Sequence, residues 1–380
     1  MNFDPTEEQR LLAASIARFV QRDCGFDSRN KIVSSEAGWS RERWTAIADL
    51  GLLGLPFPSE FGGFGGGAVD MMSTMEAIGD ALIVEPYLAT IGLGAQFVAR
   101  AGTAEQKKQI LPAVIEGRST LAFAHTEARA RYDLAHVATR ATEVGGGFRI
   151  DGAKRVVVNG AGADTLVVSA RAVGDEAHSN GIALLLVDAG TPGLGMTAYR
   201  TIDGLRAADI VFDGVEVGAD ALIGDAHAGL ALIEDVVDFA TALTCAEAIG
   251  AIKSANDATL EYLKTRKQFG TPIGSFQALQ HRMVDMVISF EQARSMASLA
   301  CGAVDGETDR TRRMHVVSAA KVKIADACRH VSQEAVQLHG GMGMTDEMKI
   351  SHTFRRISMI AQQFGDADHH LQRFAATAAG

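Results

Sequence analysis

The strongest constraint on the fold of this chain is that its hydrophobic periodicity changes twice. Helical spacing dominates residues 1–119, alternating and β-branched runs dominate residues 120–225, and helical spacing returns over residues 226–380. A length of 380 residues with 47% hydrophobic content is enough for two or three cores. The pattern therefore predicts an α+β protein with an N-terminal all-α domain, a middle antiparallel β domain and a C-terminal four-helix bundle.

The first helix is marked by a start signal. Thr6 followed by Gln9 makes a capping box before the apolar run 11–20. The glycine-rich segment 61–67 has the composition of a phosphate loop, but no predicted strand precedes it, and we interpret it as a flexible connection. Further helices are predicted over 41–50, 70–81, 88–101 and 104–116.

The middle and C-terminal parts carry opposite signals. Short runs separated by Gly, Asp and Asn predict strands at 148–150, 155–158, 165–169, 182–187, 210–212 and 215–217. Three long helices are then predicted over 229–264, 275–302 and 311–340, with a shorter closing segment.

Composition and charge exclude several classes of protein. A net charge of −10 without a basic stripe argues against nucleic-acid binding. No apolar run fits a signal peptide or a membrane span, so we expect a cytoplasmic protein. The four cysteines are scattered, which predicts reduced core residues rather than disulfides or a metal site: Cys24, Cys245, Cys301 and Cys328.

Two segments of the C-terminal half carry most of the functional information. The first, RKQFG from Arg266 to Gly270, offers a permanent cation and an aromatic ring, which suits a diphosphate beside a ring system. The second, QLHGGMG from Gln337 to Gly343, offers an amide and then glycines that allow a ligand close to the backbone. Each segment alone also fits a simple helix end or turn.

In this order, the two segments resemble the flavin-holding motifs of the acyl-CoA dehydrogenase family, and the resemblance covers essentially the whole chain. Thr126, Glu127 and Asp133 fit the family's segment after the first β-strand, and 152–159 fits its Gly-x-Lys strand. The resemblance implies FAD as cofactor and an oligomer, because part of each flavin site comes from a neighbouring subunit. The implied FAD contacts are Phe123, His125, Thr126, Val156, Val158, Arg266, Phe269, Gln277, Gln337, Gly340 and Gly341.

The general base is where the chain departs from the family. Phe364 occupies the usual place of the catalytic Glu, beside Gly365, and Ala240 with Thr241 occupies the alternative place on a helix. Glu247 shares an apolar helix face with Ala240, and burial there would raise its pKa towards a value useful for a base. The alternatives are that Glu247 reaches a neighbouring helix or water, and that a partner subunit supplies the base.

Asp366 is a second candidate for the base because it lies close to Phe364. A helix-capping aspartate is an equally simple interpretation. We expect no metal here, because Asp366, Asp368, His369 and His370 fit no standard ligand spacing.

Smaller departures concern the flavin ring and the substrate. Val156 replaces the family's usual Trp and Val158 a usual hydroxyl residue, which weakens the expected ring contacts. His125 is expected to be structural. Arg129 and Arg131 could bind a CoA phosphate or a distal substrate carboxylate, or lie in solvent.

Finer similarity narrows the expected function. The stretches 50–57, 122–127 with 131–134, and 364–370 are similar to the small subunit of bacterial pimeloyl-CoA dehydrogenases. That relationship also resembles the heteromeric enzymes that act on CoA esters of steroid side chains. We expect a subunit of an FAD-dependent acyl-CoA dehydrogenase that is reoxidised by an electron-transfer flavoprotein. It would form a homotetramer, or a heterotetramer with a larger dehydrogenase-like subunit. The alternative is a non-catalytic subunit that completes a partner's FAD site.

Overall fold

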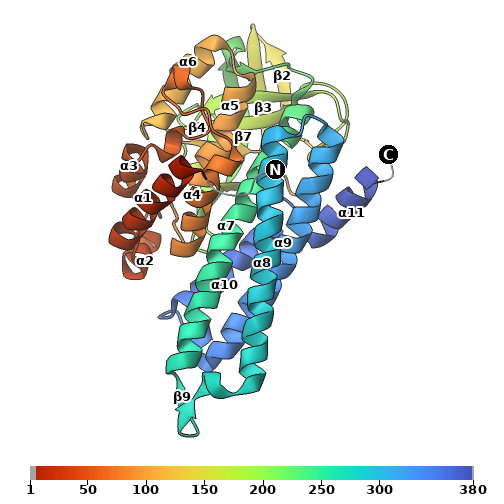
Figure 1. Ribbon diagram of the computed structural model, residues 1–380. Helices are drawn as coiled ribbons and strands as arrows, with labels where there is room; N and C mark the ends of the chain where they lie inside the picture. Colours follow the sequence, from red (N-terminus) through yellow and green to blue (C-terminus); the bar gives the residue numbers. More distant parts are fainter. Residues whose placement is uncertain (1–5, 379–380) are drawn as a thin grey trace. The chain divides into compact units, whose positions relative to one another are not determined.

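The computed structural model describes residues 6–378, with side chains up to residue 376 (Figure 1). Its contacts divide the chain into two compact units. The helical unit comprises the residues up to Lys31, Gly67–Val84 and the residues from Thr241 onward. The sheet unit comprises Ile32–Gly66 and Glu85–Ala240. The N-terminal helices are thus shared between two units, and the predicted boundaries of three domains stay a prediction.

The capping box predicted for the first helix is confirmed. In α1 (Glu7–Asp23) the Thr6 hydroxyl accepts from the Gln9 N–H at 3.2 Å, and the Gln9 side chain accepts from the Thr6 N–H at 2.9 Å. The short helix α2 (Phe26–Ser34) was not predicted. Helix α4 (Ala68–Ala81) matches its prediction to within two residues.

Five helices make up the C-terminal part of the chain: α7 (Gly229–Thr265), α8 (Gln277–Gly306), α9 (Arg310–His339), α10 (Lys349–Gln362) and α11 (Ala367–Ala378). The core of the helical unit comes from α7, α8, α9 and α10, and α11 packs on α9 (Figure 1). The predicted closing segment is therefore two helices, of which the first completes the four-helix core.

Glycine allows α4 and α7 to cross at backbone contact. A Cβ atom on Gly79 of α4 would lie 1.9 Å from the carbonyl oxygen of Glu247, and one on Gly250 of α7 would lie 1.7 Å from that of Glu76. No side chain fits at either position, so this crossing fixes where α7 places Glu247.

The sheet unit contains one eight-stranded sheet with the order β6-β7-β3-β2-β4-β5-β8, and β1 pairs with β4. The prediction of an antiparallel sheet was wrong in one respect: β1, and β2 at a single position, pair parallel with β4. The strands are β1 (Leu121–Ala124), β2 (Arg140–Val144), β3 (Gly147–Val158), β4 (Thr165–Arg171), β5 (Ile182–Asp188), β6 (Leu194–Arg200), β7 (Arg206–Gly218) and β8 (Leu222–Ile223).

Helices of the sheet unit include α3 (Arg41–Asp49), α5 (Ala95–Ala101) and α6 (Ala104–Ile115). The predicted helix 88–101 begins as a π-helix, η3 (Leu88–Gly94), before α5 continues it. Thr90 of η3 joins it to β1, because its hydroxyl donates to the Leu121 carbonyl at 3.1 Å.

The glycine-rich segment 61–67 is ordered, so its prediction as a flexible connection was wrong. The N–H groups of Phe64, Gly65 and Gly66 donate to carbonyls of residues 54–57 at 2.7–3.0 Å. Backbone hydrogen bonds, rather than side-chain packing, hold this turn, and such bonds leave no trace in hydrophobic periodicity.

All four cysteines are buried and free, as predicted. Burial raises the pKa of the Cys245 and Cys328 thiols to about 12 and that of Cys301 well above its ordinary value. None of the helices over residues 6–378 combines the length and apolar character needed to cross a membrane.

Candidate functional site

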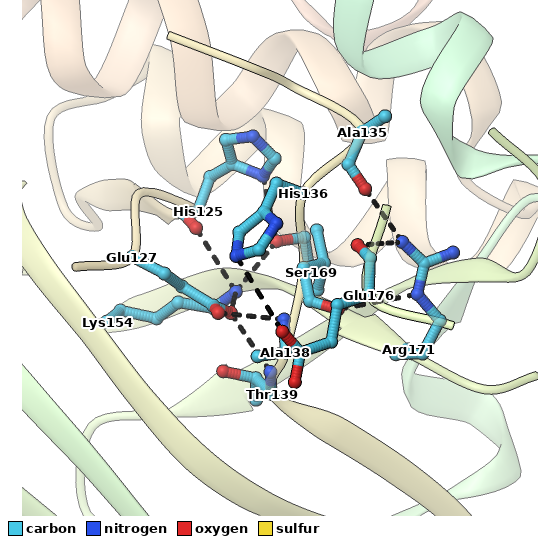
Figure 2. A network of polar contacts seen from close by, with 11 residues as sticks. His125, Glu127, Ala135, His136, Ala138, Thr139, Lys154, Ser169, Arg171 and Glu176 are labelled. Carbon is cyan, nitrogen blue, oxygen red and sulfur yellow. Dashed lines mark hydrogen bonds and ion pairs between the residues drawn. The ribbon is translucent and has the colours of Figure 1, made fainter. Parts of the chain in front are cut away.

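A buried ion pair anchors the loop that follows β1 (Figure 2). The Lys154 ammonium donates to Glu127 at 2.7 Å, to the His125 carbonyl at 3.2 Å and to the Ser169 hydroxyl at 3.0 Å. Burial lowers the pKa of Lys154 to about 8. Burial alone would raise the pKa of Glu127, but Lys154 and the Thr139 N–H hold it below its ordinary value. Both groups are charged at neutral pH, and the loop 125–127 is fixed at both ends.

His125 is a neutral, structural imidazole. Burial, reinforced by the charge of Lys154, lowers its pKa to about 3. The Ser169 hydroxyl, which accepts from Lys154, also lies 2.9 Å from His125 Nδ1. The other ring nitrogen, Nε2, points away from the network in Figure 2. The ring stacks on Phe123 with centroids 5.1 Å apart, and Phe123 packs on Phe97.

The predicted ring contacts on β3 lie at an irregularity of the strand. Val156 is 49% exposed and has φ of +52°, whereas Val158 is half-buried. Thr126 is exposed, and its carbonyl accepts from the Arg155 N–H at 2.7 Å. The loop after β1 and the irregular part of β3 are therefore joined directly.

A small hairpin presents the first C-terminal motif. Strands β9 (Lys267–Gln268) and β10 (Thr271–Pro272) flank Phe269 and Gly270, which both have positive φ, as a tight hairpin turn requires. Phe269 is 93% exposed, and its ring makes a T-shaped contact with Phe276. Arg266 and Gln277 are exposed on either side of the hairpin.

The second C-terminal motif begins where α9 ends. Gln337 is exposed in its last turn, and Gly340 ends the helix with φ of +59°. A Cβ atom on Gly340 or Gly341 would have no neighbour within 4 Å. Packing within the chain does not require glycine at Gly341, so the open space there is available to a ligand.

The segment at Phe364, where the family carries its base, is held from two helices. The Lys321 ammonium of α9 donates to the Ile360 carbonyl at 2.6 Å and to the Ala361 carbonyl at 3.3 Å, at the end of α10. Phe364 itself has φ of +59°, and its carbonyl accepts from His370 Nε2 at 3.0 Å. The segment therefore presents an apolar side chain, Phe364, at the place where the family carries its catalytic Glu.

Asp366 caps α11. Its carboxylate accepts from the His369 N–H at 2.9 Å, which is the helix-capping alternative considered above. Within the described part of the chain, no three His, Cys, Asp or Glu side chains are grouped so as to hold a metal ion.

Glu247 is paired with an arginine that the sequence analysis did not single out. Glu247 is 2% exposed on α7, and Arg356 of α10 donates to its two oxygens from Nε at 2.6 Å and from Nη2 at 2.7 Å. Of the alternatives considered, this geometry favours the one in which Glu247 reaches a neighbouring helix. The two hydrogen bonds fix the orientation of the carboxylate and place a guanidinium charge beside it. A catalytic role for Glu247 stays a prediction.

The residues fit a flavin dinucleotide. Exposed Arg266 and Phe269 supply a cation and a ring, and Gly341 leaves space beside the backbone. The family pattern described as acyl-CoA dehydrogenase N-terminal domain matches residues 6–118, the middle domain matches 122–215, and the C-terminal domain matches 227–378. The chain belongs to the acyl-CoA dehydrogenase family. Members are oxidoreductases that act on CH–CH bonds with FAD, and the predicted fold is confirmed.

Several relatives resemble the chain over almost its entire length. A probable acyl-CoA dehydrogenase, YngJ of Bacillus subtilis strain 168, is 30% identical over 98% of both chains. A steroid ACAD, Tcur3481-Tcur3483, has 30% identity and a TM-score of 0.87, with 98% of each chain covered. The ChsE4-ChsE5 complex of Mycobacterium tuberculosis has 26% identity and a TM-score of 0.88, with 100% of this chain and 99% of that chain covered.

Proposed function

We propose that this acyl-CoA dehydrogenase is a subunit of a heteromeric enzyme that introduces an α,β double bond into an acyl-CoA thioester, with the general base supplied by a larger dehydrogenase-like partner. The main support for the proposal is Phe364. It replaces the family's catalytic Glu in a segment whose backbone is held by a hydrogen bond from His370. Glu247 is engaged by Arg356, and Asp366 caps a helix. Both carboxylates that we considered in this chain already bind structural partners.

The residues of this chain would bind and orient the flavin. Arg266 would neutralise the diphosphate, Phe269 would contact the ring system, and Gln337 with Gly341 would hold the adenylate side. Thr126 and Val156 would line the isoalloxazine ring. When bound, FAD supplies the acceptor for the hydride of the β-carbon. An electron-transfer flavoprotein would collect the electrons.

The substrate class follows from resemblance and from charge. A dicarboxylyl-CoA such as pimeloyl-CoA, or a CoA ester of a steroid side chain, is our proposed substrate. Arg129 and Arg131 are exposed in the loop after β1, which supports an anionic group on the substrate. The presence of a steroid enzyme and a two-protein complex among the similar structures supports a heteromer.

The test is the visible spectrum of the chain purified with FAD, recorded anaerobically before and after addition of pimeloyl-CoA or a steroid side-chain CoA ester. We expect the chain alone to keep its oxidised spectrum, and the complex with a dehydrogenase-like partner to bleach. Bleaching by the chain alone would overturn the shared-site proposal. Glu247→Gln and Asp366→Asn would then show which carboxylate acts as the base.

A further inference from the structure

Strand β3 carries a bulge at the segment that we assign to the flavin ring. Lys154 pairs with Ile210 of β7, and Val157 pairs with Ala208, so Arg155 and Val156 together face the single residue Asp209. A bulge leaves ladder groups without strand partners and bends the strand locally. Something other than the ladder must therefore hold the two extra residues.

The bulge is also strained. A β-branched residue with φ of +52° is an outlier, and such strain costs free energy. Val156 is 49% exposed, so burial of its side chain offsets little of this cost. Strained backbone persists where the surroundings fix it, and it gathers at ligand sites.

The side chain of Asp209 supplies the missing partners. Its Oδ1 accepts from the Val156 N–H at 3.1 Å and from the Tyr199 hydroxyl at 3.0 Å, and its Oδ2 accepts from Arg155 Nη1 at 2.6 Å. The Val156 N–H and Arg155 together lower the pKa of Asp209, against a small opposing effect of burial. One carboxylate thus binds both residues of the bulge and a tyrosine of β6.

The bulge is continuous with the loop after β1. The Arg155 N–H donates to the Thr126 carbonyl at 2.7 Å, and the adjacent Lys154 donates to the His125 carbonyl at 3.2 Å. Displacement of the bulge would therefore move Thr126 as well as Val156. These are the two positions that we propose to line the isoalloxazine ring.

We propose that Asp209 is a positioning residue for the flavin: it holds the strained bulge at Val156, and through Arg155 the Thr126 loop, in the conformation that receives the isoalloxazine ring. This inference rests on the proposed flavin contacts of Val156 and Thr126. Asp209 acts through its contacts with Val156 and Arg155 rather than as a proposed flavin contact of its own.

Three variants test the role of Asp209. Asp209→Ala removes the acceptors of the Val156 N–H and of the Arg155 guanidinium. Asp209→Asn keeps an oxygen for the Val156 N–H but loses the charge that binds Arg155. Asp213→Ala removes an exposed carboxylate from the same face of β7 and is the control. Each variant is made in the protein as it binds flavin, alone or with its partner. The dissociation constant of FAD, the flavin absorption spectrum and the melting temperature are measured.

We expect Asp209→Ala to bind FAD about tenfold or more weakly, a change equivalent to about 1.4 kcal/mol, and to shift the flavin absorption bands. Its melting temperature should stay close to that of Asp213→Ala, and Asp209→Asn should fall between. Equal FAD affinity and spectra for Asp209→Ala and Asp213→Ala would overturn the inference while leaving the proposed function intact. Failure of the wild-type protein to bind FAD, alone or with a partner, would overturn both.

Discussion

Glu247 and Arg356 form a bidentate ion pair inside the helical unit, with both carboxylate oxygens bound at 2.6 and 2.7 Å. The two residues lie on α7 and α10, 109 positions apart in the sequence. Removing one member of a buried pair leaves the other charge without compensation, which costs more than the pair contributes. The pair therefore joins α7, the helix on which Glu247 lies, to α10, the helix that precedes the Phe364 segment.

Arg356→Leu should destabilise the protein by about 3–5 kcal/mol, because it leaves the Glu247 carboxylate buried and unpaired. Urea unfolding of the variant measures the loss. The control is Arg355→Ala, which removes a partly exposed pair with Asp346 and should cost less than about 1 kcal/mol. An equal decrease in the free energy of unfolding for the two variants would show that the buried pair stabilises the protein no more than the exposed pair does.

Acid should destabilise the protein through buried histidines. Burial and neighbouring cations lower the pKa of His370 to about 3 from an ordinary value of 6.5. As the pH falls below 6.5, His370 binds a proton in the unfolded chain but not in the folded chain, so the free energy of unfolding decreases. We expect this group to contribute a loss of about 2 kcal/mol between about pH 7.5 and about pH 5.

His370→Gln should remove that contribution, so its free energy of unfolding should fall less steeply with acid than that of the wild type. The control is the replacement by Gln of His281, which is exposed on α8. Urea titrations at several pH values measure the slopes. A slope for His370→Gln identical to the wild-type slope would contradict this assignment.

Phe269→Ser should weaken association between subunits and loosen FAD. A phenylalanine that is 93% exposed at a hairpin tip gains free energy only when another surface covers it. Phe64→Ser is the matched control, because Phe64 is 67% exposed in the sheet unit. Sedimentation velocity measures the association of both variants, and FAD titration measures their affinity for the flavin. An unchanged oligomer in Phe269→Ser would show that the hairpin does not take part in the interface.

Phe364→Glu should give the chain substrate-dependent bleaching of its flavin. Hydrogen bonds from Lys321 and His370 already hold the backbone around position 364, so the new carboxylate is placed on a segment of fixed conformation. Anaerobic spectra with pimeloyl-CoA or a steroid side-chain CoA ester measure the gain, and Phe364→Gln, which has no basic group, is the control. Bleaching by the Gln variant to the same extent would show that the carboxylate is not what was missing.

The sequence predicted what depends on local pattern. The capping box at Thr6 and the long helices were correct because each is encoded by residues a few positions apart. In the sheet unit, strands β1, β2, β6 and β8 were missed: β1, β2 and β8 are short, and β6 is an edge strand with little burial.

The site was predicted less completely, because its key contacts join distant residues. Arg356 meets Glu247 across 109 positions, and Asp209 meets Arg155 across 54. Hydrophobic periodicity contains no information about such pairs. Two signals could have directed attention to them: the Arg355-Arg356 pair in a helix whose other face is apolar, and the lone aspartate between the apolar residues Ala208 and Ile210 of a strand.

The burial of all four cysteines makes the folded surface free of natural thiols. Because burial also raises the pKa of three of them, maleimide dyes should leave the native protein unlabelled. A single cysteine engineered on the surface would then carry a fluorophore at one defined position without prior removal of native residues. Placed on the β9–β10 hairpin, such a probe would report directly, by a change in emission, when another subunit covers Phe269.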